Sequence, residues 1–292
     1  MSNRLFVVAP FLALACGTLG CPGSGKPTED AGTDSGTPIE DLVIQVSGTA
    51  AIHPDAVRYL QGLSLPVPKV EGLTLRVEEP LKVALNDPLG VFGSLTLPAS
   101  GAFSVTPVQV DRVNLGIAAG IRDDCAADGG SCTPKVVRSA TVLWDVAIEN
   151  KKPDLDIVGG KAFALPVAFH DQLTQAVGPA QIHALTGNQS TLVTAGCIVG
   201  KIVDAAGAPV VGAKITPGET GLSSAFFYPT ADLTSTGPST SANGLFLFVH
   251  NGGDVRPFRF TVENHPEYLT RNAGAAKDAC LVMTVYPGTV AP

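Results

Sequence analysis

Residues 200–215 read GKIVDAAGAPVVGAKI, a stretch with the pattern of two strands joined by a compact turn. Apolar residues stand on both sides of a cluster of turn-forming residues between Asp204 and Pro209. Gly207 lies inside the cluster, where it can take the positive φ that a residue with a side chain resists. The stretch therefore predicts a chain built from strands and tight turns.

The same strand signal recurs along the chain. Apolar and polar residues alternate at 73–78, 108–111, 142–148 and 258–263, so each segment has one apolar face. The 32 Gly and 23 Pro suit many turns better than long helices, and we expect only short helices around 54–61 and 169–177. A sheet with one apolar face must bury it against another layer, which predicts an all-β fold made of antiparallel sandwiches.

The second half of the chain carries a more specific pattern. The opening stretch is followed by SANGLFLF at 241–248, and together they resemble the carboxypeptidase regulatory-like domain. In that family a strand reading Gly-x-Val-x-Asp leads into a Gly-x-Pro turn, and a later strand opens with Gly-x-Phe. The resemblance implies a seven-stranded, transthyretin-like sandwich over 196–292. A long insertion at 217–241 departs from the family pattern and affects the layout of the loops.

The first half, 41–195, matches that pattern more loosely. VSGTAAIHP at 46–54, LTLRV at 73–77 and SGAFSVTPV at 100–108 stand where the corresponding strands would be, but the compact turn is missing. Two interpretations stay open, a diverged copy of the second domain and another immunoglobulin-like sandwich. We therefore expect two β-sandwich domains.

The N-terminus has the pattern of an export signal. Arg4 precedes LFVVAPFLALA at 5–15, an apolar run too short to span a bilayer as a helix. Small residues precede Cys16 and Cys21, which resembles the lipobox of bacterial lipoproteins. In that family the signal is cut directly before a cysteine that carries lipid. Cys21 is the preferred anchor because cutting there leaves four cysteines, an even set, whereas cutting before Cys16 leaves an odd thiol.

These observations predict a signal peptide at 1–20 and a lipid-anchored, flexible linker at 21–40. From Pro22 to Pro38 the chain has no Val, Ile, Leu or Phe, so it has little apolar surface to bury. The GCPGSGK at 20–26 has the spacing of a phosphate-binding loop, but Pro27 stands where Ser or Thr would hold magnesium. We therefore expect no nucleotide and no other cofactor.

The charge and length of the chain limit the classes of partner and the number of domains to be expected. The formal charge is −7, and removing a signal that carries only Arg4 makes it −8, which argues against nucleic acid as a partner. About 250 residues follow the linker, enough for one large or two modest domains. We expect an exported protein of the cell envelope, bound to the outer membrane or cell surface through its lipid.

The four later cysteines suit an oxidising compartment. Cys125 and Cys132 bracket a Gly-containing hexapeptide, and Cys197 and Cys280 begin the first and last strands expected in the second domain. Each pair is a candidate disulfide; the alternative, a zinc site, lacks the paired short spacings that zinc favours. Asp123, Asp124 and Asp128 lie in an acidic loop whose oxygens are a candidate calcium site, although such loops are usually only solvated.

Patterns that would indicate catalysis are missing from the sequence. The five histidines do not form His-Glu-x-x-His, and no Gly-x-Ser-x-Gly is present. The sequence therefore predicts a protein without enzymatic activity that binds or scaffolds a protein, peptide or glycan. The alternatives are an enzyme of unrecognised type, either a hydrolase or metal-dependent, and a purely structural spacer of the envelope.

Overall fold

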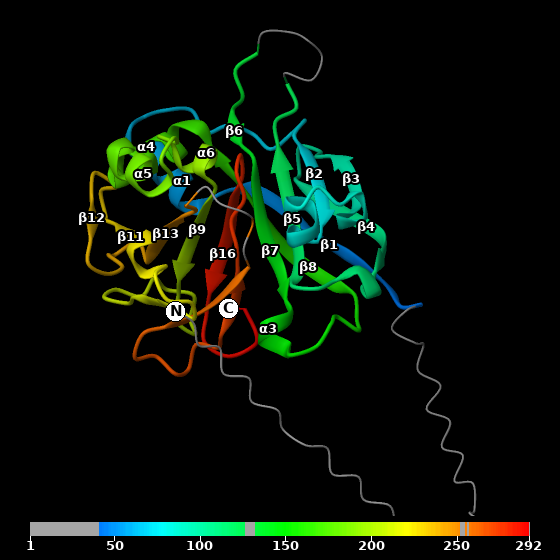
Figure 1. The fold of residues 1–292 in the computed structure, drawn as a ribbon. Helices are drawn as coiled ribbons and strands as arrows, with labels where there is room; N and C mark the ends of the chain where they lie inside the picture. Colours follow the sequence, from blue (N-terminus) through cyan, green and yellow to red (C-terminus); the bar gives the residue numbers. More distant parts are fainter. Residues whose placement is uncertain (1–40, 126–131, 252–254, 256, 292) are drawn as a thin grey trace, which may run out of the picture. The chain divides into compact units, whose positions relative to one another are not determined.

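The computed structural model describes residues 41–125, 132–251, 255 and 257–291 (Figure 1). The signal peptide and linker expected at 1–40, with Cys16 and Cys21, lie outside these residues, as does Asp128. Strands make up most of the regular structure, which confirms the all-β expectation. No helix in the described part of the chain has the length and apolar character needed to cross a membrane.

The largest sheet has nine strands and separates two apolar cores. In spatial order its strands are β12 (Thr236–Gly237), β11 (Phe226–Pro229), β13 (Leu245–Val249), β9 (Cys197–Ile202), β16 (Cys280–Val285), β7 (Ser139–Asp145), β5 (Gly116–Arg122), β2 (Thr74–Glu78) and β3 (Val91–Thr96).

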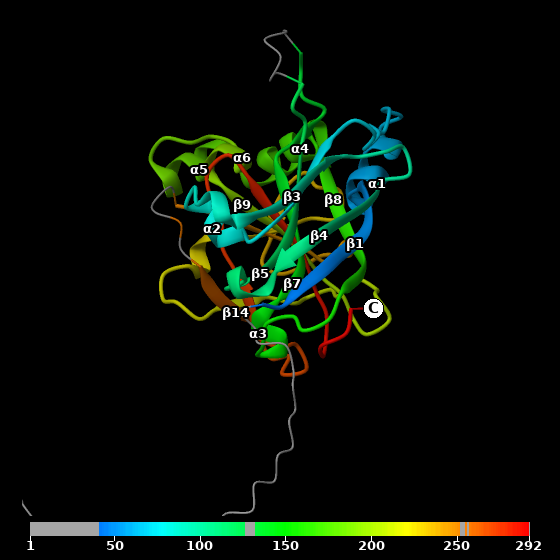
Figure 2. The same ribbon diagram turned by 90° about the vertical axis from the view of Figure 1, so that its right-hand side faces the viewer.

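Two smaller sheets pack against it. Figure 2 views the molecule from the side of the first of them, a four-stranded sheet. Its order is β4 (Ala102–Gln109), β1 (Val43–Ile52), β8 (Ile157–Pro166) and β6 (Val136–Val137). The other sheet has three strands in the order β10 (Ile215–Pro217), β14 (Phe258–Val262) and β15 (Arg271–Ala273).

The helices are short. The two helices that the sequence predicts are confirmed as α1 (Pro54–Gly62) and α4 (Val167–Val177). Proline at the first position of α1 suits its start, where a missing N–H costs nothing. The other helical segments are α2 (Pro80–Ala84), α3 (Val146–Glu149), α5 (Pro179–Thr186), α6 (Leu192–Ala195) and the 3₁₀ turns η1 (Pro88–Gly90), η2 (Val110–Arg112) and η3 (Ser223–Ala225). The strand expected over 142–148 ends at Asp145, because α3 begins at Val146.

Strand β13 shows how the nine-stranded sheet divides the two cores. Its residues Leu245 and Leu247 point into the first core, which is shared with the four-stranded sheet and the helices α4 to α6. Phe246 and Phe248 point into the second core, which is shared with the three-stranded sheet. All five residues of β13 are buried. This explains its continuous apolar sequence, which is typical of a strand covered on both faces.

The structure differs from the expected division into 41–195 and 196–292. The last strand, β16, pairs with β9 on one side and with β7 on the other, so one sheet contains strands from both halves. Residues 41–291 accordingly fall within a single compact unit. The expectation of purely antiparallel sheets is also corrected, because β16–β9, β16–β7 and β1–β8 are all parallel pairs.

The turn between Asp204 and Pro209 has the conformation the sequence predicts. Gly207 has a φ of 80°. One side-chain oxygen of Asp204 accepts hydrogen bonds from the amides of Ala206 and Ala208, both at 2.9 Å. The second strand, however, starts only at Ile215, because Val203 and Pro209 form just an isolated bridge.

Both expected disulfides are confirmed. Cys197 and Cys280 face each other in the parallel pair β9–β16, with 4.5 Å between their Cα atoms. Cys125 and Cys132 are joined across a separation of seven residues. The first disulfide fixes the register of β16, the strand that connects the two halves.

Gly200 provides a test of the two-sided packing of β9. It lies directly opposite Phe246, and a Cβ at this position would overlap the ring of that side chain. We predict that Gly200→Ala lowers the free energy of unfolding by about 1–3 kcal/mol, because an overpacked core must shift. Urea unfolding measures this loss.

Gly62→Ala is the matched control. A Cβ there meets no atom within 4 Å, so its effect should be neutral or slightly stabilising. Equal effects of the two substitutions would contradict the packing described for β9.

Candidate functional site

A cleft of 660 Å³ opens where β7 and β16 separate. The two strands pair only from Cys280 to Val282, so the rest of β16 has no strand on that side among the described residues. Thr141 and Met283 contribute to the floor, whereas β8 and the start of α1 form opposite walls. The cleft is therefore a consequence of the sheet topology.

One wall of the cleft is a strand edge. Among the residues that the structure describes, β8 pairs on the side away from β1 only with β6, through Leu165 and Pro166. Nearer the cleft, the amide of Phe163 donates to the hydroxyl of Thr141 at 2.8 Å. Because backbone groups two residues apart point the same way, the amide of Lys161 faces the cleft. An unpaired edge of this kind is a template for another extended chain.

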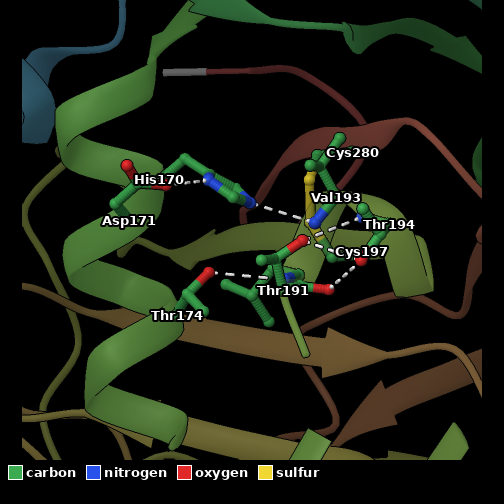
Figure 3. The surroundings of a disulfide bond; sticks show 9 residues. His170, Asp171, Thr174, Thr191, Val193, Thr194, Cys197 and Cys280 are labelled. Atoms are coloured by element: carbon green, nitrogen blue, oxygen red, sulfur yellow. Dashed lines mark hydrogen bonds and ion pairs between the residues drawn. A yellow bond between two sulfur atoms is a disulfide. The ribbon is translucent and has the colours of Figure 1, made fainter. Parts of the chain in front are cut away.

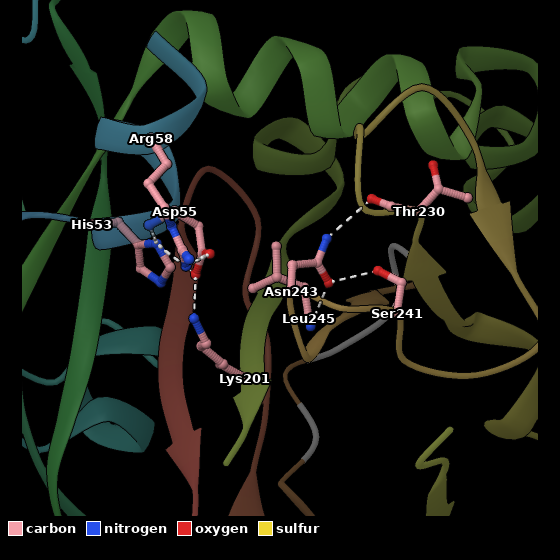
Figure 4. A network of polar contacts seen from close by, with 8 residues as sticks. All are labelled: His53, Asp55, Arg58, Lys201, Thr230, Ser241, Asn243 and Leu245. Carbon is pink, nitrogen blue, oxygen red and sulfur yellow. Dashed lines mark hydrogen bonds and ion pairs between the residues drawn. The ribbon is translucent and has the colours of Figure 1, made fainter. Parts of the chain in front are cut away.

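The opposite wall contains a buried charge cluster, shown in Figure 4. Asp55 on α1 is only 5% exposed and accepts a hydrogen bond from Lys201 Nζ of β9 at 2.9 Å. Arg58, one turn further along α1, pairs with the other oxygen of Asp55. The carboxylate thus has two cationic partners, which offsets the cost of burying it.

His53 completes the cluster as the N-cap of α1. Its Nδ1 accepts a hydrogen bond from the amide of Asp55 at 3.3 Å, so Nε2 carries the proton of the neutral ring. The ring stacks on Phe169 at 5.9 Å and meets Phe163 edge-on. Burial lowers the pKa of His53 to about 4, because desolvation outweighs the attraction of Asp55. A histidine held neutral in this way acts as a cap.

The far end of the cleft is formed by Arg271 and Tyr286. Arg271 is 3% exposed, and its guanidinium lies 4.2 Å from the centre of the Tyr286 ring. Nearby, Asp145 accepts hydrogen bonds from the amides of Ala147 and Asn272, and burial raises its pKa. The cations Lys161, Lys201 and Arg271 line the cleft, and both of its carboxylates are engaged by protein groups.

A second polar network surrounds the Cys197–Cys280 disulfide (Figure 3). His170 on α4 accepts a hydrogen bond at Nε2 from the amide of Val193, 3.0 Å away. Its Nδ1 therefore donates to Asp171, at 2.9 Å. Burial lowers the pKa of His170, which keeps the ring neutral. This histidine joins α4 to α6 and so helps to hold the layer that covers β9.

A third network, also visible in Figure 4, fixes the start of β13. The side-chain oxygen of Asn243 accepts from the amide of Leu245 at 2.9 Å and from the hydroxyl of Ser241 at 3.0 Å. Its amide nitrogen donates to the carbonyl of Thr230. All these polar groups have structural partners.

The candidate calcium residues are engaged within the protein. Asp123 accepts hydrogen bonds from the amides of Cys125 and Lys135. Asp124 pairs with Arg122 at 2.8 Å, and its pKa is lowered mainly by a hydrogen bond from Thr74. Within 41–125, 132–251, 255 and 257–291, no three His, Cys, Asp or Glu residues are arranged to hold a metal ion. The expected third ligand, Asp128, lies outside the described residues.

The sequence does not predict the cluster of His53, Asp55 and Lys201. Asp55 and Lys201 are 146 residues apart, so no local pattern joins them. Two signals were present. His53-Pro54-Asp55 has the form of a helix start, and Lys201 is the one charge within the apolar run CIVGKI.

Comparisons with known proteins add little. A scan against models of protein families gives no match, and no curated protein is similar in sequence. Among solved structures, the similar chains include a streptococcal ancillary pilin (10% identity, 85% of this chain and 70% of that chain, TM-score 0.22). Another is the shaft pilin SpaA of Lactobacillus rhamnosus GG (10% identity, 86% of this chain and 100% of that chain, TM-score 0.21). A third is the minor pilin GBS52 of Streptococcus agalactiae (10% identity, 85% of this chain and 97% of that chain, TM-score 0.23). Likenesses with such TM-scores carry no argument about this chain.

His53 predicts a pH dependence of stability. The folded chain protonates His53 only near pH 4, whereas an unfolded histidine does so near its ordinary value of 6.5. As the pH falls from 6.5 to 4 the unfolded state therefore takes up the proton first, and stability is lost, by about 3 kcal/mol at 1.36 kcal/mol per pKa unit. We predict that His53→Asn, which keeps a cap acceptor, flattens this fall in urea unfolding measured between pH 7 and 4.5.

His183→Asn is the control, since His183 is exposed on α5. This variant should keep the wild-type slope. His170, whose lowered pKa acts in the same direction, contributes to the residual slope of His53→Asn, and the raised pKa values of Glu78 and Asp145 oppose it. If His53→Asn lost stability as steeply as the wild type, the role given to His53 would be wrong.

Proposed function

We propose that the chain is an exported lipoprotein, anchored through Cys21, whose folded part is a non-catalytic binding or scaffolding module of the cell envelope. The observation that carries the proposal is the cleft, which combines an unpaired strand edge with the cations Lys161, Lys201 and Arg271. The two confirmed disulfides suit an oxidising compartment outside the cytoplasm. The lipid anchor rests on the sequence pattern before Cys21.

The cleft suits an extended chain as its ligand. Such a ligand gains backbone hydrogen bonds from the edge of β8, as in other cases where a peptide adds a strand to a sheet. Lys161 is exposed beside this edge, and Lys201 is 16% exposed. Their charges favour a ligand that carries carboxylates, because the carboxylate of Asp55 is already shared between Lys201 and Arg58.

The non-catalytic part of the proposal is supported by what two of the three buried histidines, His53 and His170, do. His53 caps α1 and His170 accepts from the amide of Val193, so each ring nitrogen that lacks a proton is already used. A general base needs that nitrogen free, with a pKa near the working pH. Lowered pKa values move both histidines away from it.

We also propose that the C-terminal strands form a carboxypeptidase regulatory-like sandwich. In support, β11, β13, β9 and β16 lie next to one another and pack on β10, β14 and β15 through the second core. Gly207 and Gly244, which stand in the turn and at the Gly-x-Phe strand that carry the resemblance, both have a positive φ. The long segment between Pro217 and Ser241 supplies β11 and β12.

The two rival functions make different predictions. An enzyme would turn over a member of a panel of ester, peptide and glycan substrates, with or without added metal, and would lose turnover when one histidine is replaced. A structural spacer would retain no specific partner. A binding module retains a partner without turnover.

The anchor is tested by mass spectrometry of the mature N-terminus. We predict a diacylglyceryl mass on Cys21, with loss of the lipid and of membrane association in Cys21→Ser. Cys16→Ser is the control and should leave both unchanged, because Cys16 belongs to the discarded signal. A mature chain that begins elsewhere, or that carries no lipid, contradicts the anchor.

The cleft is tested by reversing one charge. We predict that Lys161→Glu reduces by at least tenfold the retention of partners from a cell-envelope fraction, because it places a carboxylate beside the β8 edge. Lys69→Glu, in an exposed loop outside the cleft, is the matched control and should retain them like the wild type. Equal retention by both variants would remove the cleft as the binding surface.

A further inference from the structure

A second charged site lies on the opposite side of the nine-stranded sheet from the first core. Leu75, Val77 and Ile121 point into that core, so their neighbours Arg76 and Arg122 point to the other face. The strands β2 and β5 pair with Arg76 opposite Gly120.

Arg138 joins the same site from the residue before β7, since Ser139 lies opposite Ile121. Three neighbouring strands thus bring three guanidinium groups to one place.

Glu78 lies among these arginines. Its side chain covers Gly120, where a Cβ would come within 2.8 Å of a carboxylate oxygen, and it is 5% exposed. Burial raises the pKa of Glu78, and the positive charges of Arg138, Arg76 and Arg122 act against that rise. The arginines therefore act on Glu78 through their charge.

The three arginines differ in how far their N–H groups are engaged in hydrogen bonds within the protein. Arg122 is committed to Asp124, at 2.8 Å. Arg76, by contrast, has a buried Nε without a hydrogen-bond partner, which is a costly state for a charged group. Arg138 is exposed and so accessible from solvent. Arg76 and Arg138 are thus the two groups able to take a ligand.

The shape of the surface gives a ligand access to these groups. Arg76, Glu78, Gly120, Arg122 and Arg138 line a small cup. Glu78 and Arg138 also line an adjoining groove of 850 Å³, between α2 and the segment 276–279. The cup has a volume of only about 10 Å³, room for a single oxygen atom, so a ligand lying in the groove can place one oxygen of an anionic group at its mouth.

We propose that one carboxylate or phosphate group of a ligand binds where the groove meets the cup, through the guanidinium groups of Arg76 and Arg138, with protonated Glu78 as a third donor. Planar guanidinium groups match the geometry of both anions. The site is separate from the cleft at β8, and its outcome does not depend on the function proposed for that cleft.

Binding of the anion is linked to protonation of Glu78. An anion placed beside Glu78 disfavours the carboxylate, so binding draws a proton onto Glu78 and strengthens as the pH falls. In the described part of the chain, the charged groups that face Glu78 are Arg76 on its own strand, Arg122 from β5 and Arg138 next to β7. Asp124 lies beyond Arg122, and the groove adds one charge of each sign, Lys277 and Asp278.

The competing interpretation is that the arginines only offset the charge of Glu78. Isothermal titration calorimetry distinguishes the two interpretations. The full folded protein is titrated with inorganic phosphate and with glucuronate, at constant low ionic strength and at several pH values. We expect one of these probes to bind, more tightly at lower pH. The probe that binds more tightly then shows whether the site prefers a phosphate or a carboxylate group.

Variants locate the site. Arg138→Gln and Arg76→Gln should each weaken binding at least tenfold, while Arg259→Gln, an exposed arginine on β14, should bind like the wild type. Glu78→Gln should bind at least as tightly at pH 8. With glucuronate, whose charge is constant near neutral pH, this variant should lose the dependence on pH; with phosphate, which itself takes up a proton in this range, its dependence should differ from that of the wild type. Arg138 is exposed, so its replacement carries the test if Arg76→Gln fails to fold. Wild-type protein that binds neither probe, or an Arg138→Gln variant that binds equally well, overturns the proposal.

Discussion

The parallel pairing of β16 with two strands at once is the constraint on which the rest of the structure depends. β16 is the last strand in the chain, yet it lies between β9 from the same half and β7 from the other. Every residue from Cys280 to Val285 has a partner on β9, and Cys280 is also bonded covalently to it. The nine-stranded sheet exists because this one strand joins two smaller sheets edge to edge.

Both candidate sites follow from the way this sheet is assembled. β7 leaves β16 after Val282, and the gap between them is the cleft, closed on its sides by β8 and by the charge cluster around Asp55. On the other face, the three-stranded sheet packs against the C-terminal half of the large sheet and leaves β2 and β5 with polar residues, so Glu78 and its arginines lie there. The N-terminal half thus adds to the C-terminal sandwich the features that a ligand can use.

The sequence predicted the features that depend on neighbours in the chain. The Asp204–Pro209 turn, the short helices α1 and α4 and both disulfides follow from local residue choice and from cysteine count. It did not predict one sheet in place of two domains, because parallel partners far apart leave no local trace. The apolar runs of β9 and β13 were the available sign, since strands covered on one face alternate and these do not. The pairing of Asp55 with Lys201 is hidden for the same reason, as each residue is ordinary in its own segment.

Native-state hydrogen exchange tests the central claim, that β16 makes the two halves one folding unit. We expect the slowest amides of β5 and β7 and those of β9 and β13 to exchange with the same free energy of opening, and to lose protection together as urea is added. Two groups of amides with distinct free energies, one for each half, would show that the shared sheet does not couple them and would contradict the account.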